Sequence, residues 1–190
     1  MDKAVVAAVV AAFVVGGGLN ACTTAMDGGA APAPSAGTGG PVAYAQLKDK
    51  DGAVKGRATA RQMGDGVHID ANIENMAPGI YGIHVHQVGT CTPPDFASAG
   101  PHWNPQAKQH GTQNPAGPHK GDLPNVTVGA DGRGKVSGHI MGVTMTDGAN
   151  ALLDSDGAAI VLHAGPDDYR TDPSGNSGAR VACGVFTTGS

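Results

Sequence analysis

Two histidines stand two residues apart in the string Ile83-His84-Val85-His86, where apolar and imidazole side chains alternate. In a β-strand this spacing places both rings on the same face of the sheet. Two neutral imidazoles held on a rigid strand can chelate zinc, copper, iron or nickel. The pair alone is a weak signal of a metal site, because two solvated surface histidines would give the same pattern.

Further residues of metal-ligand type follow within 21 positions: His102, His110, His119 and Asp122. Three imidazoles and one carboxylate are a ligand set that tetrahedral zinc accepts. A polar loop with incidental histidines is the alternative, and the neighbouring His-x-His pair argues against it. His163 ends the apolar run 159–162, and a single histidine at a strand end is more often structural than a ligand.

The composition restricts the elements that could position these residues. The 190 residues include 31 Gly, 13 Pro and a single Glu, Glu74, so the material for long helices is missing and an all-α fold is excluded. The formal net charge of −4 and only seven aromatic residues (one Trp, three Tyr and three Phe) give no basis for a nucleic-acid partner.

The apolar residues repeat with a period of two, as in Val67, Ile69, Ala71 and Ile73, which is typical of strands with one solvated face. We expect strands near 42–48, 54–62, 67–75, 80–88, 125–128, 134–141, 158–164 and 180–187. Many short strands with frequent turns favour an antiparallel sandwich or barrel. Residues 89–124 and 165–179 are rich in Pro, Gly and Asn, and we expect them to be two long functional loops.

The N-terminus has the pattern of a targeting segment. An apolar run over 4–15 is shorter than the ~20 residues of a membrane-spanning helix. The string Leu19-Asn20-Ala21-Cys22 is similar to a bacterial lipoprotein cleavage box. We therefore expect a signal peptide over 1–21, a lipidated Cys22, an Ala/Gly/Pro-rich linker over 22–41 and one folded domain over 42–190. Ordinary signal cleavage after Ala25 is the alternative.

The three cysteines fit this assignment. If Cys22 carries lipid, Cys91 and Cys183 remain as an even pair, and we expect them to form a disulfide in an oxidising compartment. The expected location is the periplasm or cell envelope, lipid-anchored to a membrane. Because Thr23 does not provide an Asp-type signal for retention at the inner membrane, the outer membrane is preferred. A soluble periplasmic protein is the alternative.

Four strings carry a family resemblance: GIHVHQ (82–87), SAGPHWNP (98–105), GDLPN (121–125) and GNSGARVACG (175–184). They look like the signature segments of copper/zinc superoxide dismutases. The intervals of 8, 9 and 3 residues between His102, His110, His119 and Asp122 also match that family. The resemblance extends from about Val42 to the C-terminus.

This resemblance implies an all-β fold, an eight-stranded antiparallel Greek-key β-barrel or sandwich. It also implies one copper and one zinc ion per subunit. The copper ligands would be His84, His86, His102 and His163. The zinc ligands would be His102, His110, His119 and Asp122, with His102 bridging the two metals.

Three further roles follow from the resemblance. Asp167 matches a carboxylate that orients one copper-site and one zinc-site histidine, each of which needs an acceptor for its other nitrogen. Arg180 matches an arginine that draws the superoxide anion to copper. Cys91 and Cys183 match a disulfide that joins the metal-binding loop to the last strand.

The implied activity is superoxide dismutation, an oxidoreductase reaction in which copper cycles between Cu(II) and Cu(I) and two superoxide anions become O2 and H2O2. His102 and Arg180 would be the catalytic residues, and the zinc would be structural. The alternative is a copper- and zinc-binding carrier or structural domain without dismutase activity. We expect superoxide as substrate, no nucleic acid, membrane contact only through the lipid anchor, and a homodimer or a monomer. His68 and His139 lie opposite the apolar positions of their strands, so we expect both to be solvated.

Overall fold

The computed structural model describes residues 40–189, so the expected signal peptide, the Cys22 lipidation site and most of the expected linker lie outside the described residues. Within this range the one helical element is a 3-10 turn, η1 (Ala97–Ala99), and no helix is long and apolar enough to cross a membrane. The strands are β1 (Val42–Lys48), β2 (Val54–Met63), β3 (Gly66–Ile73), β4 (Gly79–Tyr81), β5 (Ile83–His86), β6 (Val126–Val128), β7 (Gly134–Met141), β8 (Ala159–His163), β9 (Arg180–Val185) and β10 (Thr187–Thr188).

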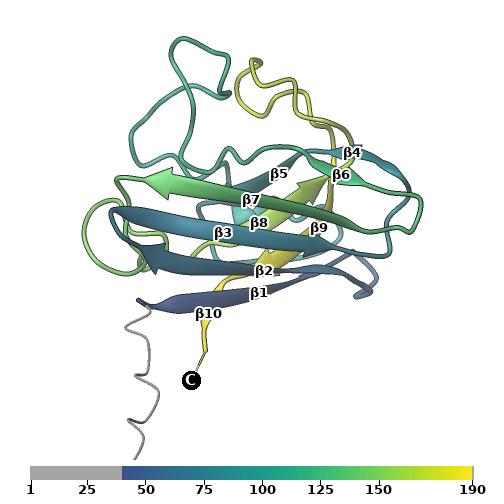
Figure 1. The fold of residues 1–190 in the computed structure, drawn as a ribbon, viewed down its shortest axis with the longest axis horizontal. Helices are drawn as coiled ribbons and strands as arrows, with labels where there is room; N and C mark the ends of the chain where they lie inside the picture. The colour runs from purple at the N-terminus through teal and green to yellow at the C-terminus, as the bar shows by residue number, and fades with distance from the viewer. Residues whose placement is uncertain (1–39, 190) are drawn as a thin grey trace, which may run out of the picture. The chain divides into compact units, whose positions relative to one another are not determined.

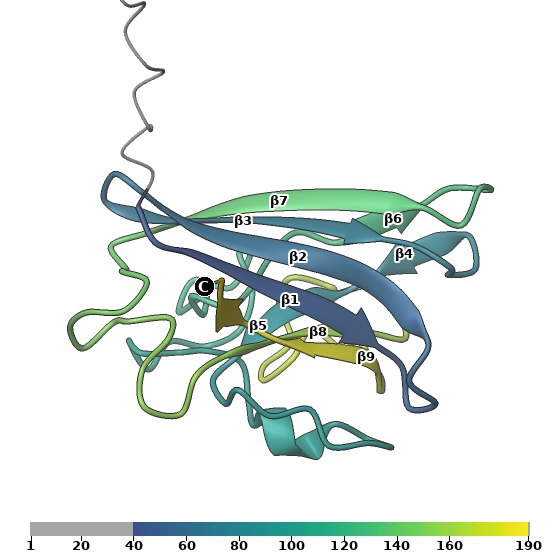
Figure 2. The same ribbon diagram turned by 90° about the horizontal axis from the view of Figure 1, so that it is seen from below.

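The strands form one antiparallel sheet that curls into a nearly closed barrel. The order is β4-β6-β7-β3-β2-β1-β9-β8-β5, with β10 paired to β1. Figure 2 shows β7, β3 and β2 as one layer and β5, β8 and β9 as the facing layer. Neighbours that are distant in sequence, such as β3 beside β7, are the mark of Greek-key connections. The prediction of an all-β antiparallel barrel is confirmed.

The eight predicted strand segments become ten strands because two of them change partners. Segment 80–88 divides at Gly82 into β4, which pairs with β6, and β5, which pairs with β8. The Gly82 N–H donates to the Gly165 carbonyl (2.8 Å), and the His163 N–H donates to the Gly82 carbonyl (2.9 Å). Segment 180–187 divides into β9, which pairs with β8 and β1, and β10, which pairs with β1. A period of two in the sequence continues through such a change of partner, so it gave no sign of the break.

The barrel interior is filled by the apolar positions of the alternating pattern. Val67, Ile69 and Ile73 of β3 are at most 2% exposed and pack with residues from the facing layer such as Ile83 and Ile160. The strands β5 and β8 are buried on both faces, because loop residues cover their outer side. A second apolar cluster marks this cover: Phe96, Ala99, Ala159, Val161 and Cys183.

Three long connections leave the barrel: 87–125, 142–158 and 164–179. The first and third contain the two predicted functional loops, and the second is an additional long connection. The first and third loops contact each other, because the His110 N–H donates to the Asp172 carboxylate (2.6 Å) and the Gln113 N–H donates to the Tyr169 carbonyl (2.9 Å). In Figure 1 both rise from the barrel on the side of β4 and β6.

The expected disulfide between Cys91 and Cys183 is present, with 5.7 Å between the two Cα atoms. It joins the first long loop to β9 across 92 residues of sequence. The loop therefore has a covalent attachment to the barrel wall close to where it covers β5 and β8.

Candidate metal centre

The two histidines of β5 point out of the barrel into the space beneath the loops. Ile83 and Val85 belong to the barrel core, so the alternation of the strand directs His84 and His86 to the opposite face. Both rings are buried, at 0% and 1% exposure. They are therefore not the solvated pair that the sequence left open.

His163 reaches the same space from the neighbouring strand. It lies at the end of β8, where the register with β9 shifts between Leu162 and His163. Ala159 and Val161 of the same strand belong to the outer cluster under the loop, and His163 shares their side of the sheet. The ring is 3% exposed.

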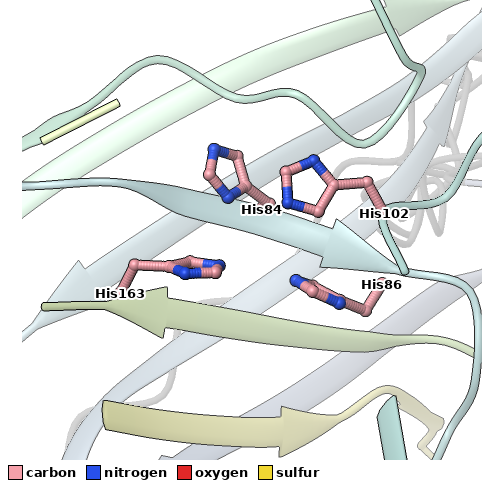
Figure 3. Close-up of side chains that lie close together, drawn as sticks. All are labelled: His84, His86, His102 and His163. Atoms are coloured by element: carbon pink, nitrogen blue, oxygen red, sulfur yellow. The ribbon is translucent and has the colours of Figure 1, made fainter. Parts of the chain in front are cut away.

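Figure 3 shows the rings of the first cluster facing one another around a common point: His84, His86, His102 and His163. Each ring offers one nitrogen to this point, and all four nitrogens lie within 4.8 Å of one another. Four buried side-chain nitrogens or oxygens of the described residues have no hydrogen-bond partner, and they are one per ring: His84 Nδ1, His86 Nε2, His102 Nε2 and His163 Nε2.

Unpartnered buried nitrogens are unfavourable unless something binds them. Three of the rings are fixed by a hydrogen bond from their other nitrogen to an acceptor. His84 Nε2 donates to Asp167 Oδ2 (2.8 Å), His86 Nδ1 to the Gly100 carbonyl (2.8 Å) and His163 Nδ1 to the Gly178 carbonyl (3.2 Å). The free nitrogens therefore carry lone pairs. Four imidazole lone pairs aimed at one point fit a copper ion.

The second cluster is arranged around the carboxylate of Asp122. Its Oδ1 atom lies 2.9 Å from His102 Nδ1, 3.0 Å from His110 Nδ1 and 3.2 Å from His119 Nδ1. Its Oδ2 atom accepts hydrogen bonds from the backbone N–H groups of Gly111 and His119, both at 2.9 Å. Three imidazoles and one oriented carboxylate oxygen in contact fit a tetrahedral zinc ion.

His102 belongs to both clusters. Its Nε2 atom is the free nitrogen of the first cluster, and its Nδ1 atom faces Asp122 in the second. One imidazole ring thus has a metal-type environment at each nitrogen. His102 is the one residue that these two clusters share. The sequence could suggest this double role only by resemblance.

Burial keeps three rings of the first cluster, His86, His102 and His163, neutral. It lowers the pKa of His86 to about 2, that of His163 to about 3, and that of His102 to about 4 even though a hydrogen bond to Asp122 acts in the opposite direction. Neutral imidazole is the form that binds metal ions. The three rings are therefore ready to bind a metal ion at neutral pH without first losing a proton.

The pKa of His110 moves in the opposite direction. Burial lowers it, but hydrogen bonds to Asp122 and Asp167 outweigh burial and raise the pKa to about 9. Burial also raises the pKa of the Asp122 carboxyl, yet the three histidine contacts hold that pKa well below its usual range. The Asp122 carboxylate therefore stays ionised and favours a cation beside it, either a proton on His110 or a metal ion.

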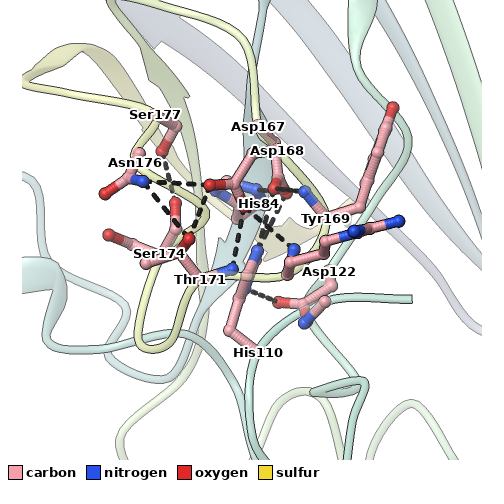
Figure 4. A network of polar contacts seen from close by, with 12 residues as sticks. His84, His110, Asp122, Asp167, Asp168, Tyr169, Thr171, Ser174, Asn176 and Ser177 are labelled. Atoms are coloured by element: carbon pink, nitrogen blue, oxygen red, sulfur yellow. Dashed lines mark hydrogen bonds and ion pairs between the residues drawn. The ribbon is translucent and has the colours of Figure 1, made fainter. Parts of the chain in front are cut away.

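Asp167 connects the two clusters (Figure 4). Its Oδ2 atom accepts from His84 Nε2 (2.8 Å), and its Oδ1 atom accepts from His110 Nε2 (3.0 Å). Those are the ring nitrogens that face away from the two candidate metal positions. Hydrogen bonds from both rings outweigh burial and hold the pKa of Asp167 below its usual range. The carboxylate is thus a shared anchor that sets the orientation of one ring in each cluster.

Sequence reasoning missed two residues that hold Asp167 in place. The Asn125 side chain donates to the Asp167 carbonyl (2.9 Å) and accepts from the Asp167 N–H (2.8 Å). Gly175 lies so close that a Cβ atom there would overlap the Asp167 carboxylate and approach His110 Nε2 to 2.7 Å, and its φ is +64°. Both residues stand in the strings that carried the family resemblance, and that was the available signal.

Arg180 lies at the edge of the first cluster. It is half-buried, and its Nη1 and Nη2 atoms donate to the carbonyls of Phe96 and Gly100, both at 2.7 Å. The Gly100 carbonyl also accepts from His86. A surface hollow of about 460 Å³ opens beside Arg180 and is lined also by Asp95 and Gly178. A larger hollow of about 770 Å³ lies over β1, β2 and β9 and contains none of the clustered histidines.

Comparison with known proteins agrees with this geometry. Residues 54–186 match the family model described as copper/zinc superoxide dismutase. The chain is 43% identical to superoxide dismutase [Cu-Zn] 2 of Aquifex aeolicus, over 76% of this chain and 85% of that protein. It is 41% identical to superoxide dismutase [Cu-Zn] of Caulobacter vibrioides, over 76% of this chain and 84% of that protein.

A solved structure is similar as well. The superoxide dismutase-like protein of Bacillus subtilis superposes with a TM-score of 0.72 at 39% identity, over 76% of this chain and 97% of that chain. The match of fold, sequence and histidine clusters leads to one assignment. The chain belongs to the copper/zinc superoxide dismutase family of oxidoreductases.

Proposed function

We propose that the chain is a superoxide dismutase, which converts two superoxide anions and two protons to O2 and H2O2. The observation that carries the proposal is the convergence of four buried, unpartnered imidazole nitrogens beside a second cluster built on Asp122. Relatives at 41–43% identity that are named copper/zinc superoxide dismutases support it.

The ligand assignment follows from the atoms that face each point. Copper would be held by His84, His86, His102 and His163, and zinc by His102, His110, His119 and Asp122. When bound, copper supplies one-electron oxidation and reduction, whereas zinc has no redox chemistry and a structural role.

His102 would move the proton. Its Nδ1 atom faces the Asp122 carboxylate, and its Nε2 atom faces the first cluster. The ring can hold a proton at Nε2 during one half of the cycle and donate it to the reduced product in the other half. Asp122 keeps the ring in position while this proton comes and goes, because hydrogen bonds from Gly111 and His119 fix its second oxygen.

Arg180 would guide the substrate. Its guanidinium borders a surface hollow and is held there by two backbone carbonyls, and one of them, that of Gly100, also accepts from His86 of the first cluster. A fixed cation beside a partly buried site attracts a small anion and raises its local concentration. Arg180 thus supplies attraction for superoxide in a protein whose formal net charge is −4.

The test is the consumption of superoxide by purified protein whose copper and zinc contents are measured on the same sample. We expect one H2O2 for every two superoxide anions consumed, at a rate that follows the copper content. Protein that holds both metals but consumes superoxide no faster than free buffer would be a metal carrier, which is the alternative considered from the sequence.

We also propose that the enzyme resides in the cell envelope as a lipoprotein. The support is the Leu19–Cys22 cleavage box, the Ala/Gly/Pro-rich stretch after it, and a disulfide of the kind that persists in oxidising compartments. Two acyl chains on Cys22 would suffice for stable anchoring, and the outer membrane is the preferred location.

A further inference from the structure

Two exposed methionines stand at one end of the barrel, and neither belongs to the histidine clusters. Met63 at the end of β2 is 49% exposed and Met141 at the end of β7 is 60% exposed. Methionine is usually buried in soluble domains. In Figure 1 the ends of β2 and β7 lie on either side of the start of β3.

The strand register brings both methionines to the same point of the sheet. Met63 pairs with Gly66 of β3 from one side, and Met141 pairs with Gly66 from the other. Directly paired residues of antiparallel strands project from the same face. The two methionine backbones are about 10 Å apart, which is two strand spacings. Both thioethers can therefore reach the space above Gly66, which has no side chain to fill it.

An imidazole already occupies the edge of this space. The Nε2 atom of His139 lies 3.0 Å from where a Cβ atom of Gly66 would be. Its nearest carboxylate oxygen, Asp65 Oδ1, is 3.8 Å away, which is too far for a hydrogen bond. His139 pairs with His68 across β3 and β7, and the two ring centroids are 6.1 Å apart. The same face thus presents two imidazoles beside the two thioethers.

The charges around these four side chains nearly cancel. Asp65 and Asp70 contribute two carboxylates, and the Asp70 Oδ1 atom is 3.4 Å from His68 Nε2. Arg61 pairs with His68 from β2, and the Lys120 ammonium donates to the Met141 carbonyl (2.9 Å). Neutral thioether and imidazole donors without excess negative charge suit a soft, singly charged ion better than a divalent one.

From this arrangement we propose that Met63, Met141, His68 and His139 form a second metal site, on the outer face of β2, β3 and β7, that binds Cu(I). The site is separate from the two clusters under the loops and shares no residue with them. The register places the four residues on the same face of three neighbouring strands, around Gly66, which has no side chain.

Silver(I) is the probe, because it is a soft monovalent ion that does not undergo redox cycling. His139 also borders a hollow of about 320 Å³ that includes Asp122, so the titration uses protein already loaded with copper and zinc. The methionine methyl groups are labelled with ¹³C. We expect one silver ion to bind per chain, with shifts of the Met63 and Met141 methyl signals, no shift of Met76, and full retention of copper and zinc.

The paired substitution Met63→Leu and Met141→Leu keeps the apolar volume and removes both sulfur atoms. We expect it to weaken silver binding about tenfold or more, since thioethers are the softest donors of the set. His68→Gln with His139→Gln should also weaken it. The control Met76→Leu, three residues beyond the end of β3, should not. Competition with a Cu(I)-specific chelator should rank the variants in the same order.

Three outcomes would overturn the site. They are no silver bound beyond the loaded centre, silver bound only as copper or zinc is released, and equal silver affinity in the wild type and the double leucine variant. Because the experiment measures silver binding and methyl shifts, its outcome does not depend on whether the protein dismutates superoxide.

Discussion

At the residue scale, the candidate metal centre depends on the different roles of the two nitrogens of each imidazole ring. His84, His86 and His163 each use one nitrogen to hold the ring and leave the other free. A ligand that is fixed in advance does not lose rotamer freedom when the metal ion binds. His102 is the exception, because each of its nitrogens faces a different cluster.

Substitution of single ligands should separate the two metal positions. His163→Ala should remove copper and abolish turnover while zinc remains, because His163 belongs to the first cluster alone. Asp122→Ala should instead lose zinc, because Asp122 is the carboxylate around which the second cluster is arranged. Metal analysis and turnover of both variants check this, with Asp51→Ala on the exposed surface as a control. Equal loss of both metals from both variants would argue against two distinct positions.

The acid side of the stability profile follows from the lowered histidine pKa values. His86, His102 and His163 titrate in the folded protein at a pKa of about 2, 4 and 3, against ~6.5 in an unfolded chain. Below pH ~6.5 the unfolded chain binds more protons, so metal-free protein loses stability as the pH falls. Each such ring contributes up to about 1.4 kcal/mol per pH unit.

The alkaline side follows from His110, whose folded pKa is raised to about 9. Its stabilising contribution is complete below pH ~6.5 and is lost as the pH rises through 9. Urea unfolding of metal-free protein between pH 4 and 9 should therefore show a maximum near neutral pH. Zinc-loaded protein should lose the alkaline decline, because the metal ion replaces the proton. Stability of the metal-free protein that rises steadily from neutral pH to pH 9 would contradict this assignment.

At the scale of elements, the centre depends on two strands that are buried on both faces. β5 and β8 pair with each other, present apolar residues to the barrel core and present His84, His86 and His163 to the loops. The first long loop supplies the remaining rings and is attached to β9 by the disulfide. The metal-binding loop is thus clamped to the barrel wall against which the centre is built.

Much of this arrangement was predictable from alternation alone. The period of two around Val67 and around His84 correctly gave strands and one shared face for His84 and His86. The break at Gly82 was not predictable, because it depends on a change of pairing partner that leaves the pattern intact. Asn125 contacts Asp167 across 42 residues of sequence, and Gly175 lies against the Asp167 side chain eight residues away. A local sequence pattern does not predict such contacts.

The disulfide should account for a large share of the free energy that holds the first long loop against the barrel. Replacing Cys91 and Cys183 together by Ser should lower the free energy of unfolding by up to about 4–5 kcal/mol, the chain-entropy value for a closed loop of this length. Urea unfolding with and without reductant checks this. Reductant should destabilise the wild type towards the variant and leave the variant unchanged. Wild-type stability that does not respond to complete reduction would show that the loop is held by other contacts.

At the scale of the whole molecule, the formal net charge of −4 repels the proposed anionic substrate. A local cation is therefore needed to offset this repulsion. If Arg180 provides that attraction, Arg180→Ala should lower the second-order rate constant with superoxide and weaken its decline with salt, since added salt shortens the Debye length to ~8 Å at 0.15 M. Arg180→Lys should retain the salt response, because the charge remains. The rate constant is measured over a range of ionic strength at equal metal content.

Arg57→Ala is the matched control, because it changes the net charge equally from an exposed position on β2. Equal effects of the Arg57 and Arg180 substitutions would assign the attraction to overall charge. An Arg180→Ala rate and salt response identical to wild type would remove the guiding role of Arg180.

Lipid on Cys22 would determine where the whole molecule resides. Cys22→Ala should move the protein from the membrane fraction to the soluble fraction, because stable anchoring needs two acyl chains and the variant has no acceptor for them. Thr23→Ala, one residue further along, should leave the protein in the membrane fraction. Fractionation of expressing cells checks both variants, and unchanged membrane association of Cys22→Ala would exclude this anchor.

If copper held by His84, His86, His102 and His163 makes this chain a dismutase, activity must follow copper binding at that position. Zinc-loaded, copper-free protein is given increasing copper while superoxide consumption is measured on each sample. We predict that the rate rises in proportion to bound copper, stops at one copper per chain, and stays at background in His163→Ala. A fully copper-loaded wild type with no turnover above background would contradict the assignment of dismutase activity.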